Sequence, residues 1–410
     1  MLLSRVNLQS RLRYRGDESL GSRISRARRT TGPALRGSTP IDAKAKLENS
    51  CAARLMIEIL AQQSAYIVRL SNSTGYLKSW KCGLSPLDLL EEYKAICGHA
   101  EAFLSKVEPS AYNLAFAGFQ FYRSIFPNRE IRDFIHRTLD ESVELPLIIV
   151  HSEQASIPWS FMYIDEPSTE KVDVSLFLGF NCIISCNIID PEQASSPPSP
   201  YIHGNVEFLG GFCDTLRWAR DFEIPVLKKF AEKTQTRAHF LDFPVLKPTD
   251  VGRASGQENK KARRALFDLA PKVVHLACHG SNHADLERNF IRLRTLYPLN
   301  SRSLNGGDND KFKQNPLVFL NICEMGFIDP QKFSSIVRVF LHAGARTVIA
   351  PDCRVDDRSA AHFSLSFYKA LLRGQPFMHA LFGARLDALE QRNDFIGLAY
   401  CLYGQPHAAF

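Results

Sequence analysis

The chain has 410 residues, of which 45% are hydrophobic and 23% charged, and this composition is typical of a soluble globular protein with room for two or three cores. The first 36 residues carry nine Arg and two acidic residues, so they account for the whole net charge of +7. The neutral remainder argues against a basic groove for nucleic acid. No apolar run reaches the roughly 18 residues of a membrane span.

The N-terminal residues 1–48 are basic, polar and without periodicity, and we expect a disordered leader. Arg with few acids is also the usual pattern of a mitochondrial presequence, which stays open as the lesser alternative. The leader lacks the apolar core of a secretory signal, so we expect a cytoplasmic location with reduced thiols. The ten cysteines form no CxxC pair, and Cys182 and Cys186 are expected to be core thiols.

Residues 49–189 form the first predicted lobe. Hydrophobic patterning predicts two strands around a polar turn within 56–70, helices over 85–107 and 111–125, and buried strands over 145–153 and 178–189. Ser85 followed by Pro86 is typical of a helix start. Four prolines and three serines in residues 190–200 then mark a linker, which we place at 190–203.

Residues 204–410 form the second predicted lobe, in which strands alternate with amphipathic helices. The predicted strands cover 205–213, 237–244, 272–280, 289–293, 316–323, 346–352 and 396–404. The predicted helices cover 214–234, 259–270, 330–344, 358–372 and 376–390. This alternation indicates an α/β sandwich around a mostly parallel sheet.

Two of these strands end in residues that can carry out chemistry. "VVHLACHG" ends on His279 and Gly280, and "PLVFLNIC" ends on Cys323. Ligands and catalytic groups gather beyond the carboxyl ends of parallel strands, so a thiol and an imidazole at neighbouring tips can form a nucleophilic pair. The imidazolium lowers the thiol pKa, and the backbone N–H groups of Gly280 and Cys323 can stabilise an oxyanion.

Each of these residues also has a simpler interpretation. His275 lies inside the strand and is expected to be a core histidine, and Cys278 points away from His279 and is expected to be a core thiol. The pair His279 and Cys323 is in itself a loose signal. A zinc site would need further ligands, for which His283 is the nearest candidate, so we expect neither a metal nor another cofactor.

Several motifs, in the same order as in the family, resemble the CHAT domain family of the caspase–separase clan of cysteine peptidases. They are "IPWSFMY", "VVHLACHG", "LVFLNICEMG", "AGARTVIAPDCRVDD", "FYKALLRGQPFMHALFGAR" and "YCLYGQP", and the resemblance spans most of residues 55–406. It implies a caspase-like three-layer αβα sandwich around a mostly parallel sheet, with an N-terminal α+β supporting lobe. It places His279 and Cys323 at the family's catalytic positions. Ser160 departs from the pattern, since the family usually has Glu there.

Relatives in this clan use an acidic residue to select Arg or Lys before the scissile bond. Asp356 and Asp357 follow a strand tip and are the candidates for this contact, which would be charge-assisted and bidentate with Arg. The alternative is N-capping of the helix that follows.

The predicted function is therefore that of a cysteine endopeptidase acting on specific protein substrates, in regulated proteolysis of the defence or cell-death type. A regulatory partner or sensor protein is expected, since the resemblance implies control by partners. The main alternative is a catalytically silent scaffold that acts by protein–protein interaction. A further alternative is acyl transfer or another thiol hydrolase activity.

Overall fold

A computed structural model describes residues 55–62, 65–107, 110–140, 145–153, 157–169, 172–188, 208–213, 215–233, 235–241, 260, 262–281, 290–292, 298–300, 311–322 and 335–406. The predicted leader 1–48 and the predicted linker 190–203 lie outside these residues. The division into two lobes therefore stays a prediction. Among the described residues, no helix combines the length and the apolar character that a membrane crossing requires.

The described N-terminal part has three antiparallel strands, four α-helices, two short 3-10 turns and two further strands. The elements are β1 (Leu55–Gln62), β2 (Ala65–Asn72), β3 (Leu77–Lys81), α4 (Pro86–Leu104), α5 (Tyr112–Ile125), α6 (Arg129–Asp140), β4 (Leu147–Ser152), η1 (Trp159–Phe161), η2 (Val174–Leu176), α7 (Leu178–Asn181) and β5 (Ile183–Ile188). The predicted start of α4 is confirmed, because Ser85 and Asp88 form a capping box and Pro86 is the first residue of the helix. The predicted strand 178–189 begins instead with the helical turn α7.

The C-terminal part alternates strands and helices as predicted. The elements are β6 (Phe208–Phe212), the π turn η3 (Ala219–Glu223), α8 (Ile224–Lys233), β7 (Ala238–Phe240), β8 (Val273–Ala277), β9 (His279–Ser281), β10 (Phe290–Arg292), β11 (Pro298–Asn300), β12 (Leu317–Asn321), α11 (Ile336–His342), β13 (Thr347–Pro351), α12 (Asp357–Leu371), α13 (Phe377–Arg392), η6 (Ile396–Leu398) and β14 (Tyr400–Gly404). Residues 262–268 are also helical.

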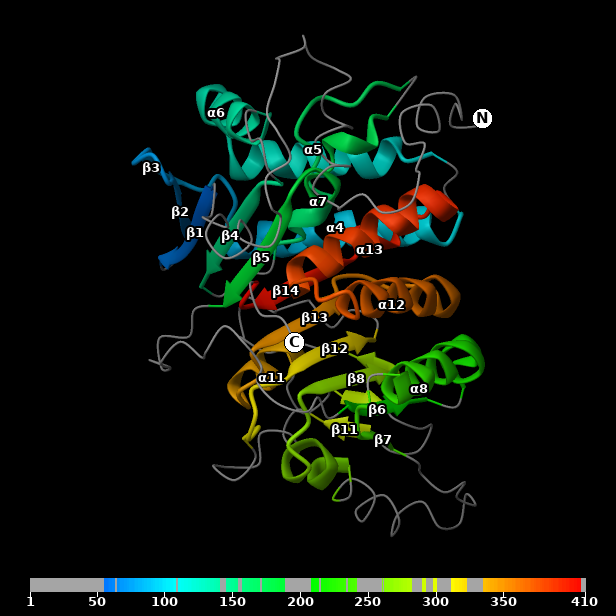
Figure 1. Cartoon of the computed structure of the whole chain (residues 1–410). Helices are drawn as coiled ribbons and strands as arrows, with labels where there is room; N and C mark the ends of the chain where they lie inside the picture. The colour runs from blue at the N-terminus through cyan, green and yellow to red at the C-terminus, as the bar shows by residue number, and fades with distance from the viewer. Residues whose placement is uncertain are drawn as a thin grey trace, which may run out of the picture.

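One sheet of 11 strands runs through both parts, in the order β3-β2-β1-β4-β5-β14-β13-β12-β8-β6-β7 (Figure 1). It contains two parallel blocks, β1-β4-β5-β14 and β13-β12-β8-β6-β7, which meet antiparallel at β13 and β14. Every residue of β8, β12 and β13 is buried, so helices and connections cover both faces of the sheet there. The predicted α/β sandwich is confirmed.

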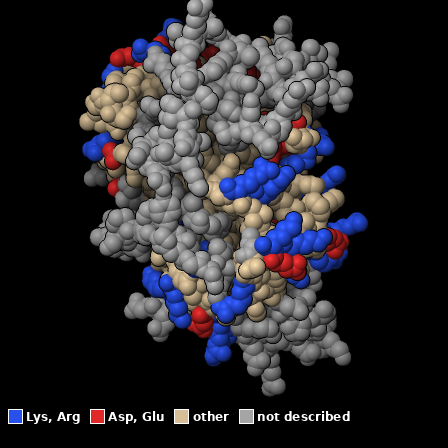
Figure 2. Space-filling model, in the orientation of Figure 1, with Lys and Arg blue, Asp and Glu red and all other residues tan. Residues whose placement is uncertain are grey.

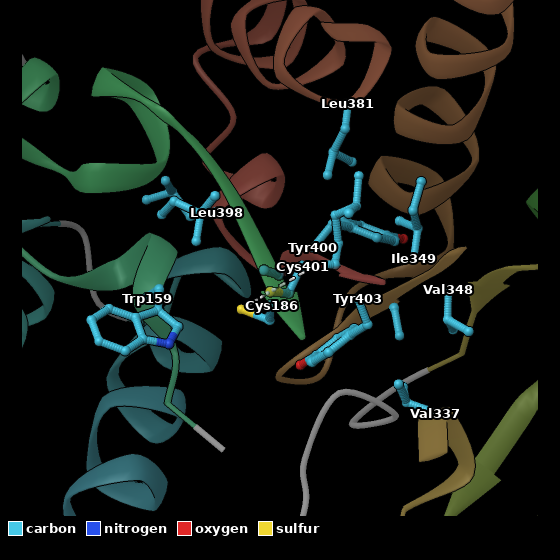
Figure 3. Close-up of a cluster of buried hydrophobic side chains, with 14 of the residues drawn as sticks. Trp159, Cys186, Val337, Val348, Ile349, Leu381, Leu398, Tyr400, Cys401 and Tyr403 are labelled. Carbon is cyan, nitrogen blue, oxygen red and sulfur yellow. Dashed lines mark hydrogen bonds between the residues drawn. The ribbon is translucent and has the colours of Figure 1, made fainter. Parts of the chain in front are cut away.

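The centre of the sheet is packed tightly where the two blocks meet. Figure 3 shows the side chains of β5, β13 and β14 in this region, where the thiols of Cys186 and Cys401 lie 3.4 Å apart. Beside them, the buried Arg385 of α13 donates to the carbonyl oxygens of Gly179, Gly397 and Tyr400. It also donates to the hydroxyl oxygen of Ser160 at 3.0 Å. Ser160, which departs from the family pattern, thus serves as an uncharged acceptor for a buried guanidinium.

Candidate active site

The two strands that precede the candidate catalytic residues are paired neighbours. β8 and β12 run parallel, with Ala277 opposite Asn321, so their carboxyl ends lie at the same edge of the sheet. His279 follows Ala277 by two residues, and Cys323 follows Asn321 by two residues. The register therefore brings the ends of the strands that precede His279 and Cys323 to one edge of the sheet, as the prediction of a thiol–imidazole pair requires.

His279 is held by a residue that follows a third strand. Its side chain is exposed, and its Nε2 lies 3.1 Å from Oγ1 of Thr215, which follows the neighbouring strand β6. Oγ1 of Thr215 in turn lies 3.1 Å from Sγ of the buried Cys213. This contact fixes the direction of the imidazole and engages one of its two nitrogen atoms.

Thr215 was not predicted from the sequence. A threonine after a strand carries no signal by itself, because hydroxyl residues are common wherever a strand turns into a helix. The contact with His279 spans 64 residues and becomes visible only when β6 is known to pair with β8. Strand order, which a single sequence does not specify, was the missing information.

Gly280 lies next to His279 in a small second sheet. It pairs with Ile291 in the antiparallel ladder of β9 and β10, and β10 pairs in turn with β11. Gly280 is half-buried. Its predicted role as an oxyanion donor stays a prediction.

Cys323 lies outside the described residues, as does His283. The described chain reaches Ile322, and both Asn321 and Ile322 are buried, so the strand leading to Cys323 is firmly packed. The distance between the Cys323 thiol and His279 thus remains a prediction. So does the oxyanion role of the Cys323 backbone N–H.

The histidine and the cysteine that precede His279 in the sequence are core residues, as predicted. His275 is fully buried, with Nδ1 at 3.0 Å from the hydroxyl of Tyr368. Cys278 is also buried, and burial raises the pKa of its thiol well above the ordinary value. A thiol with a raised pKa forms little thiolate at neutral pH, so Cys278 does not compete for the role of nucleophile.

Asp356 and Asp357 both cap helices. Asp356 is the N-cap of α12 and accepts from the Ser359 N–H at 2.9 Å, which confirms the capping interpretation for this residue. Asp357 accepts from the N–H groups of Trp218 and Ala219, at 2.7 and 3.2 Å, at the start of η3. The caps tie the connection after β13 to the connection after β6. A contact of either carboxylate with substrate stays a prediction.

The surface around these helix starts carries charges of both signs. The guanidinium of Arg358 lies over the ring of Trp218, at 5.0 Å from its centroid. In Figure 2, Lys and Arg side chains alternate with Asp and Glu side chains at the level of α12 and α8, on the described part of the face shown. Charged side chains of both signs therefore lie on this part of the surface.

Other kinds of site find little support in the described part of the chain. No group of three or more His, Cys, Asp or Glu residues is arranged there to hold a metal ion. A cavity of about 250 Å³ is lined by residues that include Phe208, Ala238 and Pro271, where β6 and β7 begin and just before β8. It therefore lies at the opposite edge of the sheet from His279 and does not belong to the candidate site.

The comparisons with known proteins agree with this fold. A search of curated proteins finds no match. Two crystal structures of the Saccharomyces cerevisiae separase–securin complex match the chain with TM-scores of 0.51 and 0.50, at 10% and 11% identity. Each match covers 90% of this chain but 31% of the other, so the chain spans about a third of the length of those chains. At this identity the likeness shows the shared fold.

The family comparison goes further than the fold. The CHAT domain family matches residues 140–404, which is more than half of the chain. The resemblance in the sequence spans most of residues 55–406, so the family match begins later in the chain. The matched residues include both His279 and Cys323. The chain belongs to the CHAT domain family.

Proposed function

We propose that this protein is a cysteine endopeptidase that acts through a dyad of His279 and Cys323. The observation that carries the proposal is the placement of His279. It follows the carboxyl end of β8 and is held by Thr215, and β8 pairs in register with β12, the strand leading to Cys323. The family and the separase-like fold support the same chemistry.

In the proposed reaction, the proton of the Cys323 thiol passes to His279, and the thiolate sulfur bonds to the substrate carbonyl carbon. Because Thr215 engages Nε2, Nδ1 is the nitrogen that exchanges this proton. The carbonyl π electrons move to oxygen, where the N–H groups of Gly280 and Cys323 are the proposed donors. When the C–N bond breaks, His279 gives its proton to the leaving amine. Water then hydrolyses the thioester with His279 as base.

We propose that the substrates are one or a few proteins, and that another protein controls the activity. The separase in the matched structures was crystallised with securin, which makes a protein partner a reasonable expectation for this fold. Regulated proteolysis of the defence or cell-death type is the proposed setting. A cytoplasmic location with reduced thiols is part of the same proposal.

Asp356 and Asp357 remain the proposed contacts for an Arg or Lys side chain before the scissile bond. A carboxylate has about four acceptor sites, so capping leaves room for a guanidinium. Asp356→Asn and Asp357→Asn are each expected to weaken the preference for Arg and Lys over Leu in a peptide library. An unchanged preference in both variants would rule out this pocket.

The test of the activity compares the full-length wild type with Cys323→Ala on a proteome-derived peptide library, in the presence and absence of cell extract as a source of activator. Cleavage that disappears in Cys323→Ala and persists in Cys82→Ala, which changes a buried thiol remote from the site, supports the peptidase. The absence of any Cys323-dependent cleavage would favour a scaffold that acts by binding. Transfer of an acyl group to an added amine would indicate the third possibility.

A further inference from the structure

A fully buried carboxylate lies beside the strand ends that lead to the candidate site. Glu223 is the last residue of η3 and is completely inaccessible to solvent. Nδ2 of Asn321 donates to both of its carboxylate oxygens, at 3.0 and 3.3 Å, and Oγ of Ser364 donates to Oε1. Nε2 of His275 lies 3.0 Å from Oε1, at ion-pair distance but not aligned as a hydrogen bond.

A second layer of contacts fixes the partners of Glu223. The hydroxyl of Tyr400 donates to Oδ1 of Asn321, and the hydroxyl of Tyr368 lies 3.0 Å from Nδ1 of His275. All of these side chains are buried. The network therefore joins η3, β8, β12, β14 and α12 through polar contacts inside the core.

A buried carboxylate needs a reason to be retained. Removing an ionised group from water costs several kcal/mol unless its hydrogen bonds are replaced, and an apolar side chain often fills such a space at lower cost. Burial raises the pKa of Cys278 and of Tyr368, and the charge of Glu223 adds to both effects. What the network does gain is a fixed geometry, since buried side chains joined by several directional hydrogen bonds have few alternative arrangements.

The two strands that Glu223 connects are the strands of the candidate site. Asn321 precedes Cys323 by two residues, and His275 precedes His279 by four. Both strands contact one carboxylate, so a displacement of β12 along β8 would break at least one of these contacts. Displacements of about 1 Å are large enough to matter for catalysis.

We propose that Glu223 is a positioning residue, which fixes the end of β12 relative to the end of β8 through Asn321 and His275 and thereby holds Cys323 in register with His279. The proposal rests on the function proposed above. Glu223 contacts no substrate in this account and acts only through these two residues.

The first test is Glu223→Gln, which preserves the shape of the side chain but replaces one acceptor oxygen by a donor. We expect kcat for a cleaved peptide to fall about tenfold to a hundredfold, with KM within about twofold. Asp221→Asn is the matched control, since it makes the same change at an exposed position of the same turn. Its kcat is expected to equal that of the wild type.

The second test exchanges the two groups. Asn321→Asp alone places two carboxylates together and is expected to lower kcat and the thermal midpoint. In the double variant Glu223→Gln/Asn321→Asp, the amide of residue 223 can donate to the carboxylate of residue 321, while its oxygen still accepts from Ser364. We expect kcat to recover at least tenfold over Glu223→Gln. A double variant with the wild-type midpoint and no recovery of kcat would overturn the proposal.

A third measurement does not depend on peptide cleavage. The rate of Cys323 alkylation by iodoacetamide, followed by mass spectrometry of its proteolytic peptide, reports how well His279 activates the thiol. We expect Glu223→Gln to slow this rate about tenfold at pH 7 and the double variant to restore it. Unchanged alkylation in an active enzyme would refute the positioning role alone. Slowed alkylation in Glu223→Gln, together with a wild type that cleaves no peptide, would support positioning and refute the proposed function.

Discussion

At the scale of single residues, the contact between Thr215 and His279 determines which nitrogen of the imidazole is available for chemistry. The hydroxyl lies 3.1 Å from Nε2 and belongs to the connection after β6, a strand on the far side of β8 from β12. Because the hydroxyl engages Nε2, Nδ1 is the nitrogen left for the proposed proton exchange with Cys323. A residue with no catalytic chemistry of its own thus contributes orientation.

Thr215→Val tests this orientation, because valine keeps the shape of threonine and lacks the hydroxyl. We expect kcat for Cys323-dependent cleavage to fall about tenfold, with KM little changed and with folding stability preserved. Thr215→Ser, which keeps the hydroxyl, should retain most of the activity. Equal kcat values in the Val variant and the wild type would show that the contact does not orient His279.

Asp352 is a second buried carboxyl group, at the end of β13. Tyr403 donates to its Oδ1 at 2.9 Å, whereas Oδ2 is buried with no hydrogen-bond partner in the described part of the chain. Its backbone carbonyl accepts from the Tyr93 hydroxyl of α4, so the residue lies between the N-terminal helix and the sheet. Burial raises the pKa of Asp352 to about 7, against the opposing effects of Tyr403 and the Arg385 charge.

This raised pKa makes the stability depend on pH. An unfolded Asp titrates near pH 4, so the folded protein holds the proton more tightly, and the contribution of Asp352 to stability is lost as pH rises from about 4 through about 7. We expect the free energy of unfolding of the wild type, measured against Asp352→Asn by chemical denaturation, to decrease between pH 5 and pH 8. A difference between the two proteins that stays constant with pH would contradict this assignment.

At the scale of elements, helix packing in the N-terminal part depends on one close backbone approach. A Cβ atom added to Gly118 in α5 would overlap the carbonyl oxygen of Phe161 in η1 and would come within 3.1 Å of the Tyr163 nitrogen. Both obstacles are backbone atoms, which cannot rotate away. The helix therefore lies directly on the segment that carries Trp159 and Ser160.

Gly118→Ala is expected to destabilise the fold by about 1–3 kcal/mol, because overpacking forces the helix away from η1. Gly98→Ala in α4 is the matched control, since nothing lies within 4 Å of an added Cβ there. That variant should gain about 0.5–1 kcal/mol from reduced backbone freedom. Denaturation midpoints that shift equally in both variants would contradict the packing argument.

The π turn η3 shows where helix patterning reaches its limit. Periodicity predicts a helix over 214–234, and the structure has a π turn at Ala219–Glu223 followed by α8. Pro225 follows the turn and has no N–H group to donate to the carbonyl oxygen four residues before it, which disfavours a regular α-helix at this point. The wider π turn ends at the buried Glu223, so the break in the regular helix lies at the residue that Asn321 and Ser364 contact.

At the scale of the whole molecule, the sheet joins sequence segments that the predicted linker separates. β5 precedes the predicted linker, β14 is the last strand, and the two pair in parallel through Ser185 and Cys186. Apolar patterning predicted most strands and helices correctly, although β3, α6 and β11 were missed. β3 has no buried side chain and therefore no apolar alternation. α6 buries Ile131, Ile135 and Leu139, so its helical period is present in the sequence.

The candidate site was predictable only in part. His279 and Cys323 follow from strand ends and motifs, and the core status of His275 and Cys278 follows from their position in or beside a buried strand. Thr215 and Glu223 were not found, because their partners lie 64 and 98 residues away, on strands whose order the sequence does not reveal. Residues that act through neighbours require the sheet topology first.

The central claim is that His279 activates the thiol of Cys323. Its most direct test is the rate of Cys323 alkylation as a function of pH in the wild type and in His279→Gln, followed by mass spectrometry of the peptide that contains Cys323. The account predicts a wild-type rate that rises through a pKa at least one unit below the ordinary thiol value of about 8.5, and a return to that value in His279→Gln. Identical profiles in the two proteins, with an ordinary thiol pKa in both, would contradict it.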